Sequence, residues 1–238
     1  MHKLSDRMMM NVGLIPTDMR VADIGCDHGW VSIYLISQGR AKKVVAMDVA
    51  SGPLERAREH VKNAGLENQI DIRLSDGAEK LIFEEDGQLE VDVVLMAGIG
   101  GHLAIRLIEN SLDKMKAAKC IVIQAQSDID YVRKRVTELG FLIEAEDMVL
   151  EDGKYYNAMR IVPVKDKLAE LSEVELQYGP VLIKKQHPVL LKYIDYKKST
   201  YMKILDGLAD SGNDQEKRRE EIVHELELIE NCYKGITG

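Results

Sequence analysis

Short apolar segments alternate with longer segments in which apolar residues recur every three or four positions. The apolar segments have the length of strands and lie at residues 21–24, 44–47, 70–74, 91–96 and 120–123. Helical spacing of apolar residues is found between them, at 31–37, 54–64, 103–109 and 131–139. Strands and helices that alternate in this way predict βαβ units, and therefore a mostly parallel sheet with helices on its faces.

Two further strand patterns end this region and lie close together, at 141–149 and 155–162. The Asp152-Gly153 pair between them is typical of a two-residue hairpin turn. The sequence therefore predicts an α/β fold whose seven-stranded sheet is mostly parallel and ends in an antiparallel hairpin. A plain dinucleotide-binding domain does not need that ending.

The chain changes character after Pro163, because the segment from Lys165 onward is rich in charge and has helical patterns. Two apolar series with steps of three and four residues predict two helices, and Lys197 interrupts the first of them. Their apolar members are Leu190, Ile194, Tyr201, Ile204 and Leu208, then Ile222, Leu226, Ile229 and Tyr233. A turn at Ser211-Gly212-Asn213 would make them an antiparallel pair. We expect an α/β domain at 1–163 and a helical hairpin domain at 164–238.

The composition is that of an ordinary globular protein, with 45% hydrophobic and 30% charged residues among 238. No segment approaches the ~18 consecutive apolar residues of a membrane span, and the N-terminus lacks the pattern of a signal peptide. Three cysteines, Cys26, Cys120 and Cys232, fit neither a disulfide framework nor a zinc site. We therefore expect a cytoplasmic protein with no membrane segment and no metal.

Charge is distributed unevenly along the chain. The formal net charge of −8 argues against a protein that binds nucleic acid through its overall charge. Residues 184–203, however, carry six lysines and one acid. This segment is a candidate for contacts with RNA phosphates, with a solvated helix face as the alternative. The candidate residues are Lys184, Lys185, Lys192, Lys197 and Lys198.

The strongest motif, ADIGCDHGW, follows the first predicted strand and leads into a helix. Its glycines allow a tight turn close to a ligand, and the helix N-terminus offers free N–H groups. The G-x-G-x-x-G spacing of dinucleotide enzymes is missing, and its acids would repel a pyrophosphate. Such acids suit the positive amino-acid end of S-adenosyl-L-methionine (SAM), and a glycine-rich turn without a ligand is the alternative. The candidate cofactor residues are Asp23, Gly25, Cys26, Asp27, His28 and Gly29.

Acidic residues also follow the second and third predicted strands. Asp48, with Val49 after it, ends the second strand, where an acid can accept the ribose hydroxyls of an adenosine. A helix N-cap is the alternative role of Asp48. Ser75, Asp76 and Gly77 follow the third strand and can contact adenine, or they form an ordinary turn. Acids after three successive strands at one sheet edge together favour a cofactor site.

Glycines dominate the segment after the fourth predicted strand, Met96-Ala97-Gly98-Ile99-Gly100-Gly101. Their missing side chains would let a flat base slide against bare backbone near the methyl group. A turn that requires a positive φ is the alternative, and it explains one glycine better than three. Ala97 and Gly98 are therefore further cofactor candidates, and Gly98 and Gly100 are catalytic candidates.

Six segments together resemble the bacterial tRNA adenine-N1 methyltransferases of the TrmK family, in order over residues 4–163. They are LSDRMMM, ADIGCDHGW, Gly52-Pro53, LSDGAEKL, MAGIGG and GKYYNAM. The chain departs from the family pattern at Gly29-Trp30 and at Ala125, where a proline is common. The resemblance implies a Rossmann-like class I SAM methyltransferase that methylates N1 of adenine 22 in tRNA. It makes 1–163 the SAM-binding domain and 164–238 the candidate tRNA-binding hairpin.

The chemistry of adenine N1 sets what such an enzyme needs. N1 carries an in-plane lone pair and can attack the methyl group directly, so alignment and an acceptor for the exocyclic amine matter more than a strong base. Asp27 or a backbone carbonyl in 97–101 can be that acceptor, and Asp27 can equally bind the methionine ammonium. His28 is either a proton relay or a packed histidine. Arg7 and one of Tyr155 and Tyr156 are RNA-binding candidates, and the other tyrosine should be core.

Three other functions fit parts of the same pattern. The first is a SAM enzyme that acts on another RNA site or on a small molecule. The second is a nicotinamide-dependent oxidoreductase, which the missing G-x-G-x-x-G and Asp27 disfavour. The third is a cofactor-binding scaffold without catalysis. We expect tRNA as the partner, and a monomer or weak dimer.

Overall fold

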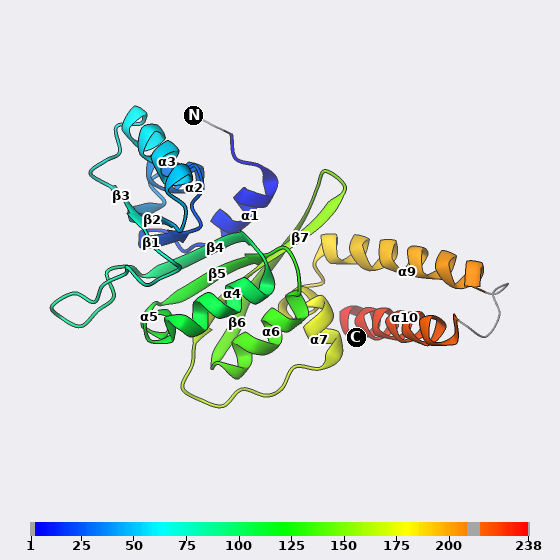
Figure 1. Cartoon of the computed structure of the whole chain (residues 1–238). Coiled ribbons are helices and arrows are strands. Elements are labelled where there is room, and N and C mark those ends of the chain that lie inside the picture. Colours follow the sequence, from blue (N-terminus) through cyan, green and yellow to red (C-terminus); the bar gives the residue numbers. More distant parts are fainter. Residues whose placement is uncertain (1–2, 209–214, 238) are drawn as a thin grey trace. The chain divides into compact units, whose positions relative to one another are not determined.

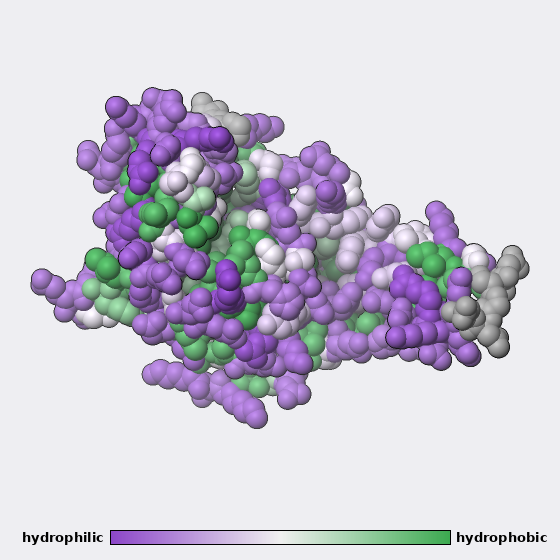
Figure 2. Space-filling view, in the orientation of Figure 1, coloured by the Kyte–Doolittle hydropathy of each residue, from purple (hydrophilic) through white to green (hydrophobic). Residues whose placement is uncertain are grey.

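A computed structural model describes residues 3–208 and 215–237, so the predicted turn at Ser211-Gly212-Asn213 lies outside the described residues. The chain forms two compact units, Met1–Ala169 and Glu170–Gly238. The described helices include none that is both long and apolar enough to cross a membrane. On the face shown in Figure 2, most of the surface of each unit is hydrophilic.

The first unit contains one seven-stranded sheet with the strand order β3-β2-β1-β4-β5-β7-β6 (Figure 1). The pairs among β1 to β5 are parallel, whereas β7 runs antiparallel to both β5 and β6. The strands are β1 (Met19–Ile24), β2 (Ala41–Asp48), β3 (Ile70–Leu74), β4 (Val93–Ile99), β5 (Cys120–Ala125), β6 (Phe141–Glu151) and β7 (Lys154–Pro163). The predicted Rossmann-like fold, mostly parallel with an antiparallel end, is confirmed.

Helices cover both faces of this sheet, which is why its central strands are apolar throughout (Figure 1). All six residues of β5 are buried, for example. One face carries α1 (Asp6–Leu14), α2 (Trp30–Ser37) and α3 (Ser51–Asn63), whose apolar residues share a core cluster with β1, β2 and β4. The other face carries α4 (Gly101–Asn110), α5 (Leu112–Ala117) and α6 (Ile129–Glu138).

The chain leaves β1 toward β2 and leaves β4 toward β5, so the strand order reverses between β1 and β4. At such a point the loops after the two strands diverge and leave a crevice outside the carboxyl ends of the strands. The β4 strand is also irregular between Ala97 and Ile99, where Gly98 adopts a φ of +76°. The fold therefore places an opening beside the motif loops.

Two local features hold the antiparallel end of the sheet. Asp152 and Gly153 have φ values of +49° and +74°, the backbone form that a two-residue hairpin turn between twisted strands prefers. The predicted turn is thus confirmed. Arg133 on α6 forms a fully buried ion pair with Glu146 on β6, with Nε and Oε1 2.9 Å apart. Nothing in the local sequence pattern predicted this pair.

The second unit is helical, but it begins later than the sequence predicts. Its elements are α7 (Glu173–Tyr178), α8 (Pro180–Lys184), α9 (Pro188–Leu208) and α10 (Glu216–Thr237). The helical pattern was expected to begin at Lys165, whereas the first helix starts only after Ser172, which forms a capping box with Glu175. The predicted pair of long helices is present, and α9 packs against α10.

Lys197 lies inside this helical pair and does not follow the expectation that it contacts RNA. Its ammonium is 3.0 Å from a carboxylate oxygen of Glu225 and lies 5.2–5.8 Å from the ring centres of three tyrosines. Those tyrosines are Tyr178, Tyr193 and Tyr201. Burial by itself would lower the pKa of Lys197, but Tyr193 and Glu225 raise it. The interruption in the apolar series is therefore a packed cation, held between aromatic rings and a carboxylate.

Candidate active site

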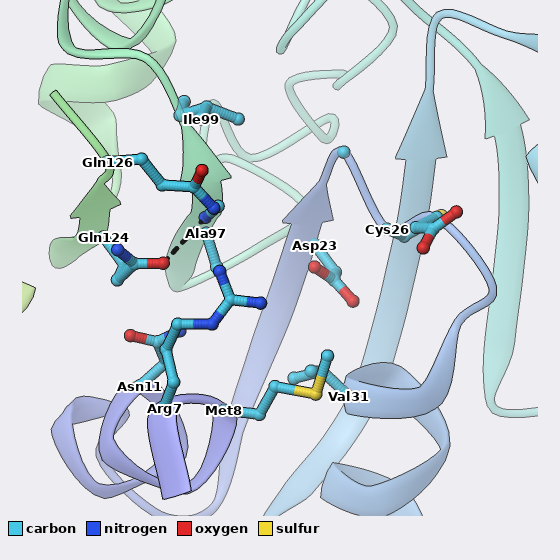
Figure 3. A pocket seen from close by; sticks show the side chains of 13 residues that line it. Arg7, Met8, Asn11, Asp23, Cys26, Val31, Ala97, Ile99, Gln124 and Gln126 are labelled. Carbon is cyan, nitrogen blue, oxygen red and sulfur yellow. Dashed lines mark hydrogen bonds between the residues drawn. The ribbon is translucent and has the colours of Figure 1, made fainter. Parts of the chain in front are cut away.

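The loops after β1, β4 and β5 enclose a cavity of about 320 Å³ with α1 at its side (Figure 3). The cavity lies where the strand order reverses. Its lining consists of Arg7, Met8, Asn11, Asp23, Gly25, Cys26, Asp27, Val31, Ala97, Gly98, Ile99, Gln124 and Gln126. Six of the sequence-predicted cofactor residues are in that set: Asp23, Gly25, Cys26, Asp27, Ala97 and Gly98.

The loop after β1 requires its two glycines. Gly25 and Gly29 adopt φ values of +73° and +74°, which side chains rarely tolerate. The N–H groups of Gly25 and Cys26 both donate to the carbonyl of Met47 at the end of β2, at 2.8 and 3.0 Å. Gly29 caps α2 without a side-chain hydrogen bond, so the first N–H groups of α2 have no side-chain acceptor from the cap. The positive φ values and the paired N–H groups thus fix the course of the loop between β1 and α2.

Asp48 joins the loops after β1 and β2. Its Oδ2 accepts a hydrogen bond from the Asp27 N–H at 3.3 Å, and its Oδ1 accepts one from Ala50 at 2.9 Å. The N-cap of α3 is Ala50, so the alternative role of Asp48 as that cap is not what the structure shows. Two apolar side chains near Asp48 are largely exposed. Val49, the next residue, is 69% exposed, and Leu74, which pairs with Asp48 between β2 and β3, is 54% exposed. Leu74 was not among the residues predicted for the site.

The loop after β3 has divided roles. The buried hydroxyl of Ser75 donates to the carbonyl of Gly77 at 2.9 Å and accepts from the N–H of Lys80 at 3.1 Å. Gly77 has a φ of +55°, and a Cβ there would lie 2.9 Å from a methyl carbon of Leu107. The alternative of an ordinary turn therefore accounts for Ser75 and Gly77. Asp76 remains exposed at this sheet edge.

The two acids of the first loop have contrasting environments. Asp23 is only 4% exposed, and its Oδ2 accepts a 2.6 Å hydrogen bond from the hydroxyl of Ser32 on α2. Burial raises the pKa of Asp23 to about 6, although the Ser32 hydrogen bond acts in the opposite direction. Asp27 is exposed, and one of its oxygens lies 3.5 Å from Nε2 of His28. The residues that line the cavity include Asp27 but not His28.

The three glycines after β4 have different reasons to be glycine. Gly98 has a positive φ, and its N–H donates to Oε1 of the buried Gln124 at 3.1 Å. A Cβ on Gly101 would lie 2.5 Å from the carbonyl oxygen of Ser127, so the packing of α4 requires glycine there. Gly100 has neither restriction, because its φ is negative and a Cβ would meet only the Ser127 hydroxyl, at 3.6 Å. The fold therefore does not require glycine at position 100.

Several cavity residues were not selected from the sequence. Gln124 is a polar residue in an otherwise apolar buried strand, and Asn11 is a buried polar residue on the apolar side of α1. Both anomalies are visible in the sequence and could have been used. The remaining unselected lining residues are Met8, Val31, Ile99 and Gln126.

The predicted RNA-binding residues lie in different places. Arg7 lines the cavity, and its guanidinium carbon lies 5.2 Å from the ring centre of Tyr156. Tyr156 packs partly against the core. Tyr155 is also half-buried, so neither tyrosine is fully buried, and Tyr156 is the one that packs against the core. In the second unit, Lys184, Lys185 and Lys192 are exposed, and Lys198 is half-buried with its ammonium 5.8 Å from the ring centre of Tyr233.

The described part of the chain holds no group of three or more His, Cys, Asp or Glu side chains arranged to bind a metal ion. Comparison with known protein families matches residues 21–231 to the family described as TrmK, tRNA (adenine(22)-N(1))-methyltransferase. The chain belongs to the TrmK family. The family and the enzyme class predicted from the sequence, a tRNA adenine-N1 methyltransferase, are therefore confirmed.

Individual relatives and solved structures are similar to this chain over nearly their full length. The tRNA (adenine(22)-N(1))-methyltransferase of Bacillus subtilis is 27% identical over 235 residues, which cover 95% of each chain. The structure of M. capricolum TrmK, solved with S-adenosyl-homocysteine, has a TM-score of 0.80 and 26% identity, and covers 99% of this chain and all of that one. A protein of the NADB-Rossmann superfamily from Streptococcus agalactiae has a TM-score of 0.83 and 26% identity, covering 97% of both chains.

The buried carboxyl of Asp23 should make the protein less stable at neutral pH than an uncharged variant. The pKa of Asp23 is raised to about 6 in the folded state, whereas that of an aspartate carboxyl in an unfolded chain is about 4. The contribution of Asp23 to the free energy of unfolding therefore falls as the pH rises from about 4 to about 6. Asp23→Asn should relieve this cost, by on the order of 3 kcal/mol at most.

Urea unfolding of wild type and Asp23→Asn between pH 4 and 8 measures this effect. The variant should have the larger free energy of unfolding above pH 6, and the difference between the two proteins should disappear toward pH 4. Asp166→Asn, at an exposed position, is the matched control and should show no such gap. A gap of constant size across this pH range would mean that Asp23 does not titrate as described.

Proposed function

We propose that this TrmK-family chain transfers the methyl group of SAM to N1 of adenine 22 in tRNA at the carboxyl ends of β1 to β4. The observation that supports this most directly is the arrangement of Asp23, Asp27 and Asp48. These carboxylates come from two successive loops, and a hydrogen bond from Asp27 to Asp48 holds the loops together. A pyrophosphate would be repelled there, whereas a cofactor with cationic groups and ribose hydroxyls is stabilised.

The residues at this edge fit the parts of SAM. Asp48 is half-buried at the end of β2 and can accept hydrogen bonds from the ribose hydroxyls. Val49 and Leu74 offer exposed apolar surface for an adenine ring, and Asp76 is an exposed acceptor for its amino group. The cavity beside Gly25, Asp23 and Asp27 suits the methionine end, which carries an ammonium. Bound SAM supplies an electrophilic methyl group on a sulfonium.

The protein's own part in the reaction is alignment. Adenine N1 is neutral and attacks through its in-plane lone pair, so the chain needs to hold the base in line and accept from its exocyclic amine. Gly98 and Gly100 leave bare backbone where a flat base can approach, and Gln124 holds the loop rigid through the Gly98 N–H. Asp27 or a backbone carbonyl in 97–101 accepts from the amine, and Tyr155 or Tyr156 flanks the displaced base.

The second unit supplies the contacts with tRNA in this proposal. We assign 1–163 as the methyltransferase domain and 164–238 as the tRNA-binding helical domain. Lys184, Lys185, Lys192 and Lys198 are the proposed phosphate contacts, and Lys197 is left out because it pairs with Glu225. The protein works on tRNA in the cytoplasm, as a monomer or weak dimer.

Mass mapping of nucleosides after incubation with SAM and unmodified tRNA tests this function. The expected product is 1-methyladenosine at position 22. Methylation at another position, or of a small molecule instead, would replace the proposed substrate. SAM binding with no transfer to any RNA would identify a cofactor-binding scaffold.

Asp48→Ala should weaken SAM binding by about 1–3 kcal/mol, because it removes the acceptor for the ribose hydroxyls. Isothermal titration calorimetry measures the affinity, and thermal unfolding checks that the variant is folded. Asp166→Ala removes an exposed carboxylate far along the chain and should bind SAM as wild type does. An Asp48→Ala affinity equal to that of wild type would remove Asp48 from the site.

Gly100→Ala should reduce turnover by on the order of tenfold to a hundredfold while SAM affinity and stability hold, because the added methyl obstructs the base. The fold accommodates this Cβ, as the 3.6 Å contact with Ser127 shows. Gly101→Ala is the contrasting variant and should lose about 1–3 kcal/mol of stability through overpacking. A fully active Gly100→Ala enzyme would show that the base does not approach position 100.

Replacing Lys184, Lys185 and Lys198 together with glutamine should weaken tRNA binding and leave SAM binding unchanged. Each lost phosphate contact should lower the log–log slope of tRNA affinity against salt by roughly 0.7–0.9. The matched control replaces Lys42, Lys43 and Lys62, which are exposed on the first unit near the amino ends of β2 and β3. If the two triple variants bind tRNA with the same affinity and salt slope, the lysines of the second unit form only a solvated face.

A further inference from the structure

The described lining of the cavity includes three side-chain amides, which belong to Asn11, Gln124 and Gln126. Gln124 is fully buried and uses both ends of its amide. Its Oε1 accepts from the Gly98 N–H at 3.1 Å, and its Nε2 donates to the carbonyl of Ala125 at 3.1 Å. Asn11 is only 1% exposed, so the surrounding chain covers its amide. Gln126, in contrast, is exposed, and its side chain makes no hydrogen bond with another described residue.

Gln126 follows β5 directly and lies beside the glycines after β4. Its backbone N–H donates to the carbonyl of Ile99 at 2.8 Å, which fixes its position next to the irregular end of β4. Its Nε2 lies 3.5 Å from where a Cβ of Gly98 would be, and Figure 3 shows the amide beside the end of β4. The amide therefore borders the bare backbone that the proposed function gives to the target base.

An amide without a protein partner at this place is complementary to one edge of adenine. Its oxygen accepts and its NH₂ group donates, whereas an ionised Asp27 only accepts and Arg7 only donates. Adenine offers N7 as an acceptor beside its exocyclic amine as a donor, and a glutamine pairs with this edge through two hydrogen bonds. Such a pair leaves the lone pair of N1 unobstructed, so the base can still attack the methyl group.

We propose that Gln126 determines the specificity for adenine, with its Oε1 accepting from the exocyclic amine and its Nε2 donating to N7. This inference rests on the proposed function, because it requires an adenine beside Gly98. The second hydrogen of the amine points toward the N1 side and is left for Asp27 or a backbone carbonyl in 97–101. Positive charge spreads onto the amine as N1 gains the methyl group, so both hydrogen bonds from the amine strengthen in the transition state. Guanine offers two acceptors on this edge, which leaves one of them facing the amide oxygen.

Methyl transfer to tRNA that carries adenosine or 7-deazaadenosine at the methylated position isolates the N7 contact, because the analogue has a C–H in place of N7. Judged by kcat/KM, wild type should prefer adenosine roughly tenfold to a hundredfold more strongly than Gln126→Leu does. The preference is compared between variants, so that any intrinsic difference in reactivity between the two bases cancels. Gln69→Leu, at an exposed position just before β3 and thus at the opposite edge of the sheet, is the matched control and should keep the wild-type preference.

Gln126→Glu tests the same contact with the opposite sign. Its carboxylate still accepts from the amine but repels the lone pair of N7, so this variant should favour 7-deazaadenosine more than Gln126→Leu does. Calorimetry should give both variants the SAM affinity of wild type.

A Gln126→Leu enzyme with the wild-type preference for adenosine would overturn the proposal. Weakened SAM binding with that preference retained would also overturn it, because Gln126 would then act on the cofactor. Wild-type protein that methylates neither tRNA would instead refute the proposed function itself.

Discussion

The reversal of strand order between β1 and β4 is the constraint on which the site depends. The loops after these two strands run in opposite directions and leave a cavity between them. Loops that ran in the same direction would pack together and leave no such cavity. The hydrogen bond from the Asp27 N–H to Asp48 then fixes the loop after β1 against the end of β2. Together these features bring acids from successive loops to one edge, although each loop on its own resembles an ordinary turn.

The electrostatics of the cavity show a conflict between stability and function. Asp23 is buried beside other acids, and its raised pKa reports that the ionised form is disfavoured in the folded protein. Such a carboxyl is useful when a cationic ligand group offsets its charge. Arg7 lines the same cavity and adds a positive charge to the acids of its lining. Under the proposed function, the charges of this wall fit an amino acid better than a phosphate.

Local sequence patterns were sufficient for the fold, because strand and helix periodicity, the Asp152-Gly153 turn and the acids after strands are all local signals. From these patterns, cavity residues were predicted only on the loops that follow the strands. Arg7 and Gln124 enter the cavity from segments more than a hundred residues apart, which no spacing rule connects. The surroundings of Lys197 were missed for a similar reason, since Glu225 and Tyr178 lie on other helices. Gly100 differs from Gly98 and Gly101 in that the fold does not require a glycine there, and only the geometry of the three residues shows this difference.

The position of the cofactor is the central claim, and a crystal structure of this protein with S-adenosylhomocysteine tests it most directly. Ribose hydroxyls are expected at Asp48, the purine beside Val49 and Leu74, and the amino-acid end in the cavity lined by Asp23 and Asp27. The side of the sulfur that carries the methyl group in SAM should face the opening at Gly98 and Gly100. A cofactor bound with its amino-acid end outside that cavity, or with its purine against the glycines after β4, would contradict the account.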